Sequence, residues 1–420
     1  MRTFAAALLG GLVPLLGLGQ TPPGPPTSSG CVDCHIALDD SRITPPATAF
    51  AEDVHAHAGL TCAGCHGGDP RAEDQDVAHD RRRGFRGKPS PREIPAFCGN
   101  CHADAAVMKQ YNPSLRVDQL PEYRTSGHGR ALAKGDETVA TCSSCHGAHG
   151  ILPVEDPRSP VYPTHIGDTC NRCHGDAALM GAHGLPSDVL AKYRQSVHFE
   201  TLTKKGDLSA PTCNSCHGNH GAAPPQVASV ANVCGTCHNI FAEQFKSSPH
   251  EATFAEMGLP GCVTCHENHA IVHPPDEFLA AGPDSKCESC HEPGTKGAEA
   301  AASMYAALMR LREETATARR MLRTEAEAGM EVSKIQFELA KADEALTKAR
   351  VDVHYFSPAA VDKAAAEGLA VARTSKEAAV RVHSEREFRR KGLFASLALI
   401  LVAIVALAVK IRDLDRRGRP

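Results

Sequence analysis

All eighteen cysteines of this 420-residue chain occur in Cys-x-x-Cys-His units, and this pattern limits what the chain can fold into. Nine such units follow one another, and no cysteine lies outside them. The spacing is the attachment signature of haem c: both thiols bond to the porphyrin and the adjacent histidine binds the iron. We therefore predict nine covalently attached haems. The predicted thioether residues are Cys31, Cys34, Cys62, Cys65, Cys98, Cys101, Cys142, Cys145, Cys170, Cys173, Cys213, Cys216, Cys234, Cys237, Cys262, Cys265, Cys287 and Cys290. The predicted proximal iron ligands are His35, His66, His102, His146, His174, His217, His238, His266 and His291.

Zinc sites and disulfide bonds are the other common uses of paired cysteines. Four-cysteine zinc sites use Cys-x-x-Cys pairs two at a time, and nine is an odd number of pairs. Disulfide bonds suit an exported protein, but neither they nor zinc explain a histidine after every pair. Both alternatives are therefore set aside.

The composition agrees with a fold built around cofactors. The chain has no tryptophan, 5% aromatic residues, 35 glycines and 29 prolines, and residues 31–291 contain few long apolar runs. Such a segment buries too little apolar surface to offset its chain entropy unless the porphyrins supply the core. We expect a mainly α-helical fold with much irregular loop and little or no β-structure. The net charge of −4 gives no basic surface for nucleic acid.

The cysteine-rich region is an internal repeat. A single motif at residues 31–35 precedes four two-motif modules, at about residues 52–110, 123–180, 193–240 and 247–293. In the three clearer modules, a Ser-x-His element precedes the first motif, and a second extra histidine follows that motif three residues later. The first module has diverged and offers His55 or His57, and then His79.

The extra histidines are the candidates for the distal iron ligands. The repeat predicts eight: either His55 or His57, together with His79, His128, His149, His198, His220, His250 and His269. The ninth is left open among the other of His55 and His57, His165, His183 and His273. His354 and His383 lie in a later helical region and are not expected to bind iron. Iron with two histidine ligands is closed to substrate and suits electron transfer.

From residue 298 the composition changes to Ala, Glu, Lys, Arg and Leu, which favours helix. Apolar residues spaced alternately by four and three predict a coiled-coil seam, interrupted at Thr315, Glu325 and Gly329. Ser357 and Pro358 suit the start of a second helix after a turn, so residues 298–391 are expected to form an antiparallel helical hairpin. The arms would measure about 80 Å and about 50 Å, and a break near Gly329 would resolve this mismatch.

Both ends of the chain carry apolar segments. Residues 1–19 are predicted to be a signal peptide, so the haem domain at 20–297 would lie in the periplasm. Residues 392–410 contain an uncharged apolar run that predicts one transmembrane helix, followed by a cytoplasmic tail at 411–420. The expected location is the inner (cytoplasmic) membrane, with a single crossing.

The chain resembles the bacterial multihaem cytochrome c families with doubled Cys-x-x-Cys-His modules. The resemblance covers residues 31–291 and rests on the nine motifs, the Ser-x-His elements, and the Cys-His-Gly-x-His elements that end at His149 and His220. It implies two histidines on each iron and a role as a respiratory electron carrier between the quinone pool and periplasmic or extracellular acceptors. The Glu-Asn spacer before His269 and the C-terminal anchor depart from the family, so a membrane cytochrome b or an iron–sulfur subunit is expected as the electron donor.

Two other functions remain open at this stage. A multihaem reductase of a small nitrogen or sulfur oxyanion would need one open iron, for which the haem at Cys31 is the candidate. The helical hairpin could also serve to dock a partner or to form a homo-oligomer. An electron carrier rather than an enzyme is the preferred interpretation.

Overall fold

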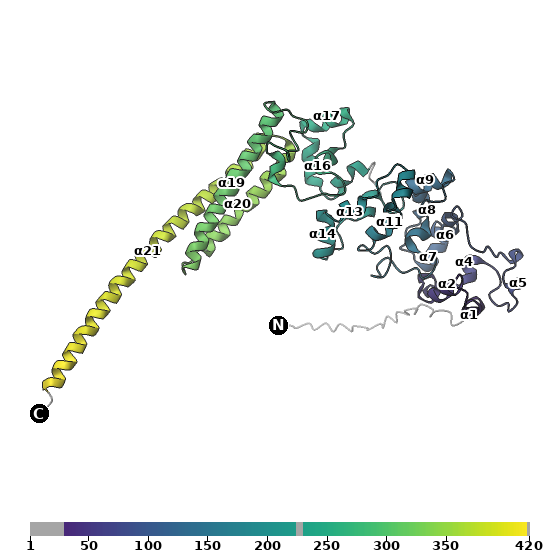
Figure 1. Ribbon diagram of the computed structural model, residues 1–420, viewed down its shortest axis with the longest axis horizontal. Coiled ribbons are helices and arrows are strands. Elements are labelled where there is room, and N and C mark those ends of the chain that lie inside the picture. The colour runs from purple at the N-terminus through teal and green to yellow at the C-terminus, as the bar shows by residue number, and fades with distance from the viewer. Residues whose placement is uncertain (1–28, 224–229, 418–420) are drawn as a thin grey trace, which may run out of the picture. The chain divides into compact units, whose positions relative to one another are not determined.

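The computed structural model describes residues 29–223 and 230–417, and every regular element in these ranges is a helix (Figure 1). The mainly helical fold predicted from the sequence is confirmed. The expected signal peptide at 1–19 and the last three residues of the tail lie outside the described residues. The chain divides into two compact units, Met1–Val230 and Ala231–Pro420.

The first unit consists of short helices joined by loops. Its α-helices comprise between four and nine residues, because prolines, glycines and capping Asp, Ser and Thr residues recur throughout this part of the sequence. The large buried apolar side chains are few and scattered, among them Met108, Leu132 and Leu202. The elements are α1 (Gly30–Ala37), α2 (Thr44–Ala49), η1 (Phe50–Glu52), α3 (Val54–His57), α4 (Cys62–His66), α5 (Gln75–Ala78), η2 (Arg81–Arg83), α6 (Ile94–His102), α7 (Ala105–Tyr111), α8 (Gln119–Thr125), α9 (Gly127–Ala133), α10 (Cys142–His146), α11 (Ile166–His174), α12 (Ala177–Ala182), α13 (Val189–Tyr193), α14 (Val197–Lys204) and α15 (Cys213–His217).

The second unit combines the last attachment motifs with long helices. The segment η3 (Val230–Thr236) lies at the boundary between the units. The remaining elements are α16 (Asn239–Lys246), α17 (Pro249–Met257), α18 (Gly261–His266), η4 (Asp276–Leu279), α19 (Lys296–Glu327), α20 (Ser333–Asp352), η5 (Val353–Tyr355) and α21 (Pro358–Arg417). The sequence suggested a division near residue 297, but the last module packs with the long helices because Asp276 and Leu279 contact them.

The helices α19, α20 and α21 form a three-helix bundle (Figure 1). Gly329 adopts φ 80° just beyond the end of α19, where the chain reverses. The helices then run side by side: Arg319 of α19 forms an ion pair with Asp343 of α20, and Lys348 of α20 forms one with Glu367 of α21. The break foreseen near Gly329 is therefore a second turn, so the longer predicted arm is two helices.

The apolar seam predicted from the sequence is the buried face of this bundle. Leu308, Leu311 and Leu322 of α19 are almost completely buried. Close approach of the helices is possible because Gly368 of α21 has no side chain: a Cβ there would lie 2.8 Å from the Leu311 side chain. Glu325, which interrupts the seam, is buried opposite α21, where His383 and Arg386 pair with its carboxylate.

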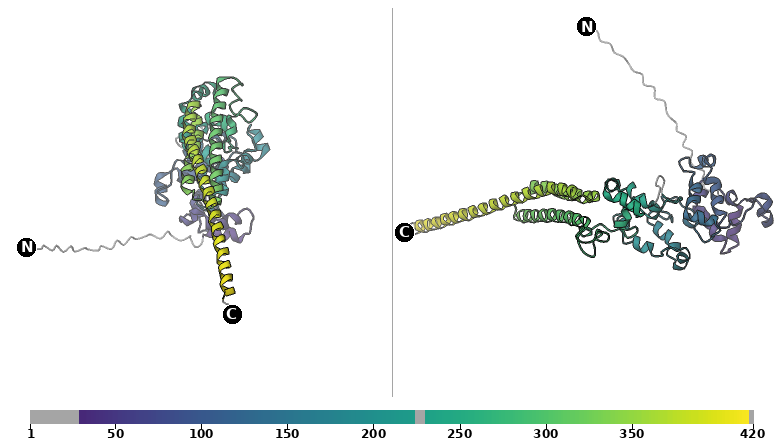
Figure 2. Two further views of the ribbon diagram at one scale, coloured as in Figure 1. Left: turned by 90° about the vertical axis from the view of Figure 1, so that its left-hand side faces the viewer. Right: turned by 90° about the horizontal axis from the view of Figure 1, so that it is seen from above.

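The C-terminal half of α21 extends beyond the other two helices of the bundle (Figure 2). Its buried residues end at Ala379, and the apolar side chains from Leu393 to Leu414 are at least half exposed. The most apolar 18-residue window has a mean hydropathy of 2.8, and none of it is buried. By length and composition this helix is able to cross a membrane.

Candidate haem-binding site

The attachment motifs lie on helical turns. The motifs beginning at Cys62, Cys142 and Cys213 form the short helices α4, α10 and α15, and the motifs ending at His102 and His174 close α6 and α11. A helix places residues i, i+3 and i+4 on one face. Both cysteines and the histidine of each such motif therefore face the same side, as attachment to one porphyrin requires.

The residue after the first motif of each module turns the chain sharply. Gly67, Gly147 and Gly218 have φ values of 70°, 85° and 79°, with ψ near 180°. That region of backbone space is open almost only to glycine. Glu267 takes the same conformation in the last module, with φ 63° and ψ −168°, so this module contains a strained non-glycine residue.

The Ser-x-His elements are helix N-caps. The hydroxyls of Ser126 and Ser196 accept hydrogen bonds from backbone N–H groups in the first turns of α9 and α14, at 2.9 Å and 3.1 Å. Each cap places its histidine in the first turn of the helix that follows. In the diverged first module, Asp53 caps α3 and accepts from the backbone N–H of His55 at 2.9 Å. The element there is Asp-x-His, which makes His55 the equivalent residue.

In three modules the capped histidine faces the second motif histidine of its own module. The ring centres of His55 and His102 are 5.9 Å apart, with an angle of 81° between the ring planes. For His128 and His174 the distance between ring centres is 6.1 Å and the angle between ring planes is 61°. For His250 and His291 the values are 5.9 Å and 82°. Three modules thus repeat one arrangement.

The second extra histidine of a module instead faces a motif of the preceding module. The His149 ring centre lies 6.0 Å from that of His66, at an interplanar angle of 20°, and His220 lies 6.2 Å from His146, at 13°. His79 likewise faces His35 of the single leading motif, at 6.0 Å and 14°. His354, which is outside the set expected from the sequence, faces His266 at 6.0 Å and 16°.

These separations fit a metal between the rings. With metal–nitrogen bonds of about 2.0 Å and about 1.2 Å from each ring centre to its nitrogen, two imidazoles opposite each other on one metal have centres about 6.4 Å apart. The seven pairs measure between 5.9 Å and 6.2 Å. Each of the seven pairs joins a motif histidine to an extra histidine, and their separations are close to that expected of two ligands on one metal.

The protonation of these histidines suits metal binding. Burial lowers the pKa of nine of the expected ligands, namely His35, His102, His128, His146, His149, His174, His220, His250 and His266. A lowered pKa favours the neutral imidazole, which is the form that binds metals. The Nδ1 atoms of His55 and His79 lie 2.8 Å from Asp53 Oδ1 and 3.0 Å from Gln75 O, so Nδ1–H donates to those oxygens and Nε2 is left for iron.

The other candidates for the ninth ligand are not members of the seven ring pairs described above. His57 and His273 are exposed. The Nδ1 of His165 lies 3.0 Å from the Ser159 carbonyl oxygen, and His183 lies 3.5 Å from the Asp136 carboxylate. Of the four remaining expected ligands, His198 is on α14, His217 closes α15, His238 precedes α16 and His269 follows α18.

Cysteines of consecutive motifs come together. A hydrogen bond from the Cys98 thiol lowers the pKa of Cys142 to about 7, and one from Cys234 lowers that of Cys262 to about 7. Cys170 and Cys213 are joined in the same way, which lowers the pKa of Cys213. The attachment sites of these consecutive motifs therefore lie next to each other.

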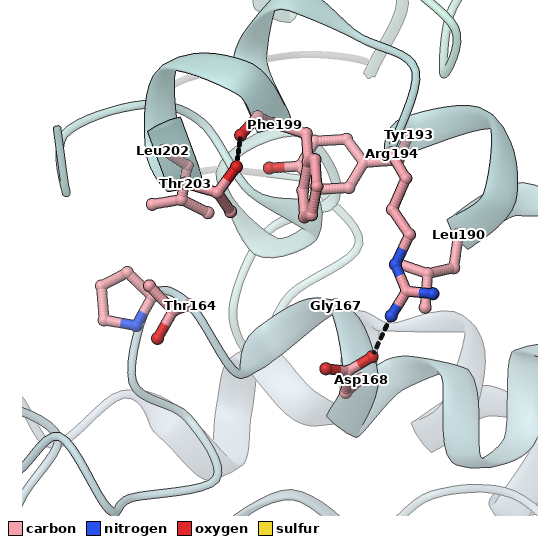
Figure 3. Close-up of a pocket in the computed structure, with 10 residues that line it drawn as sticks. Thr164, Gly167, Asp168, Leu190, Tyr193, Arg194, Phe199, Leu202 and Thr203 are labelled. Carbon is pink, nitrogen blue, oxygen red and sulfur yellow. Dashed lines mark hydrogen bonds and ion pairs between the residues drawn. The ribbon is translucent and has the colours of Figure 1, made fainter. Parts of the chain in front are cut away.

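A small pocket lies between α11, α13 and α14 (Figure 3). Leu190, Tyr193 and Leu202 line it, and an ion pair from Arg194 Nη2 to Asp168 Oδ1 at 2.8 Å closes one side (Figure 3). Its volume is about 80 Å³, and neither a cysteine nor a motif histidine lines it. Asp168 belongs to the second module and Tyr193 to the third, so the pocket is a crevice between two modules. Tyr193 also donates a hydrogen bond to the Pro211 carbonyl oxygen at 2.9 Å.

Comparisons with known proteins agree with this geometry. The cytochrome c3 family profile matches residues 54–175, which contain the first module and most of the second. The chain is a multihaem c-type cytochrome. It is 25% identical over 284 residues to the C-type polyheme cytochrome OmcB of two Geobacter sulfurreducens strains, DL-1/KN400 and ATCC 51573/DSM 12127/PCA. The match covers 61% of this cytochrome and 31% of the relative, so the cytochrome corresponds to about a third of OmcB. No solved structure matches it significantly.

Proposed function

We propose that this cytochrome carries electrons in a respiratory chain through nine haems, each held by two histidines. The observation that carries the proposal is the pairing of motif and extra histidines at one spacing, found in both units of the fold. The polyhaem relative supports the same class of function.

The protein contributes ligands, orientation and proximity. Haem c, when bound, supplies an iron that exchanges one electron between its ferric and ferrous states. Two histidines held on one iron would leave no position on the metal for a substrate. The adjoining cysteines Cys98 and Cys142, and likewise Cys170 and Cys213, bring consecutive attachment sites together, so that electrons are passed along the chain of modules.

The leading motif was the sequence-based candidate for an open, catalytic iron. The ring centres of His79 and His35 are 6.0 Å apart, which supports a closed iron at this motif. Gln75 accepts from the Nδ1–H of His79 at 3.0 Å through its carbonyl oxygen, an arrangement that orients a ligand. Electron transfer is therefore preferred over reduction of a small oxyanion.

Membrane attachment is proposed through the exposed apolar part of α21. In this arrangement the haem region lies in the periplasm and the helix crosses the cytoplasmic membrane once. From Pro358 to the start of the apolar run, α21 rises about 50 Å at ~1.5 Å per residue. If α21 stands upright, the last module is too far from the bilayer to meet quinol directly, so a membrane cytochrome b or an iron–sulfur protein is the proposed donor.

The test is a cofactor count combined with electron paramagnetic resonance on the protein solubilised from membranes. We expect nine haems per chain by intact mass and haemochrome absorbance, and ferric signals that are all low-spin. Ligand planes near parallel and near perpendicular should give two classes of low-spin signal, because the splitting of the iron orbitals depends on that angle. A colourless protein would refute haem binding, and a high-spin signal equal to one haem would refute the closed-iron proposal.

A further inference from the structure

We infer that His354, in the turn between α20 and α21, is the distal ligand of the iron attached through Cys262, Cys265 and His266. This inference rests on the proposed function, since it requires a haem at that motif. It adds a ligand from outside the repeat and gives the helical bundle a direct part in haem binding.

The order of pairing leads to this residue. The first motif of a module pairs with an extra histidine from the module that follows, as His66 does with His149 and His146 with His220. The fourth module is the last in the repeat. Its first motif, which ends at His266, therefore has no partner histidine from a following module. His354 faces His266 instead. Their ring centres are 6.0 Å apart and their ring planes make an angle of 16°, as in the pairs His66–His149 and His146–His220.

The surroundings of His354 resemble those of the other proposed distal ligands. Its Nδ1 lies 3.0 Å from the Val351 carbonyl oxygen, so Nδ1–H donates there and Nε2 remains available. The ring of Phe241 meets its edge at a centre-to-centre distance of 4.9 Å, which helps to hold its orientation.

The turn that carries His354 is fixed to the last module at several points. Phe356, in the left-handed conformation at φ 52°, lies with its ring 4.0 Å from that of His250. The Gln244 amide donates to the Asp352 carboxylate at 3.1 Å. Gly297 near the start of α19 passes so close to His291 that a Cβ would lie 2.3 Å from its Nδ1. The bundle therefore contacts histidines of both motifs in the last module.

The proposed ligand also links the bundle to this haem. The distal ligand of this haem belongs to the turn that begins α21, the helix proposed to enter the membrane. A movement of the bundle would therefore change the position of this ligand.

The experiment uses the full-length cytochrome with His354→Ala, and His383→Gln as the matched control. His383 lies in the same bundle but pairs with Glu325, so the control should leave every haem unchanged. For His354→Ala we expect an unchanged haem count, one additional high-spin ferric haem per chain, and one additional carbon monoxide bound per reduced chain. Added imidazole should restore the low-spin state.

A second variant is needed because another residue could bind the iron in place of His354, or the haem could be lost. His354→Met should keep the haem six-coordinate, raise the reduction potential of one haem, and produce the near-infrared band of a methionine-ligated ferric haem. The inference is overturned if the wild-type protein carries its haems while both variants keep wild-type spectra and carbon monoxide stoichiometry. Failure of the proposed function looks different, because the wild-type protein would then lack covalent haem.

Discussion

Replacement of Asp276 would measure how strongly the last haem module is held on the three-helix bundle. The buried carboxylate of Asp276 lies in η4 and accepts two hydrogen bonds from Arg350, each 2.8 Å long, and one from Arg312, 3.1 Å long. These residues join a loop of the module to α19 and α20, 36 and 74 positions away in the sequence.

The expected loss of stability depends on how exposed the two arginines are to water. Removing one member of a fully buried ion pair costs about 3–5 kcal/mol, mainly because the other charge is left without solvent. Here the guanidinium side chains of Arg350 and Arg312 are 41% and 46% exposed, so water would rehydrate them. We therefore expect Asp276→Ala to cost about 2–3 kcal/mol, Arg350→Ala about 2 kcal/mol and Arg312→Ala about 1 kcal/mol.

Native-state hydrogen exchange of backbone amides in η4 and α20 would give the free energy of local opening for the detergent-solubilised protein. Asp343→Ala is the control, since Asp343 forms an ion pair with Arg319 in which both side chains are about half exposed. Such surface pairs contribute about 0–1 kcal/mol. If Asp276→Ala lowers the opening free energy no more than the control does, this explanation of docking is wrong.

Two further predictions concern the modules themselves. His55→Ala should convert one haem per chain to the high-spin form while His57→Ala leaves the ferric spectrum unchanged, because only His55 faces His102; equal spectra for the two variants would contradict this. Glu267→Gly should raise the unfolding free energy by about 1 kcal/mol, since it relieves backbone strain of about 1–3 kcal/mol against an entropy cost of about 0.5–1 kcal/mol. Guanidinium unfolding followed by circular dichroism measures that change, and a lower midpoint for Glu267→Gly would argue against strain at this position.

The candidate distal ligands show how much of the site the sequence repeat could predict. Ser-x-His elements predict equivalent positions because a capping side chain and a first-turn ligand are both local features. The choice between His55 and His57 stayed open because the first module has aspartate in place of serine. Asp53 caps α3 in the same way, so an Asp-x-His pattern was the signal that pointed to His55.

His354 could not be found by that route. It lies beyond the repeat, among residues whose composition predicts helix and nothing else. Tertiary contacts such as the packing of Phe356 on His250 and of Phe241 on His354 bring the turn to His266. Contacts between residues so far apart in the sequence depend on how whole helices pack, and no local pattern records that.

The sequence by itself determined the attachment chemistry, the helical class and the buried seam of the bundle, because each depends on residue spacings within one or two turns. Tertiary structure decided which histidine faces which motif, and that the chain reverses at Gly329 to make three helices instead of two. The physical reason is that ligand pairing and helix direction are set by burial of surfaces from distant segments, whose free energy exists only after those segments meet.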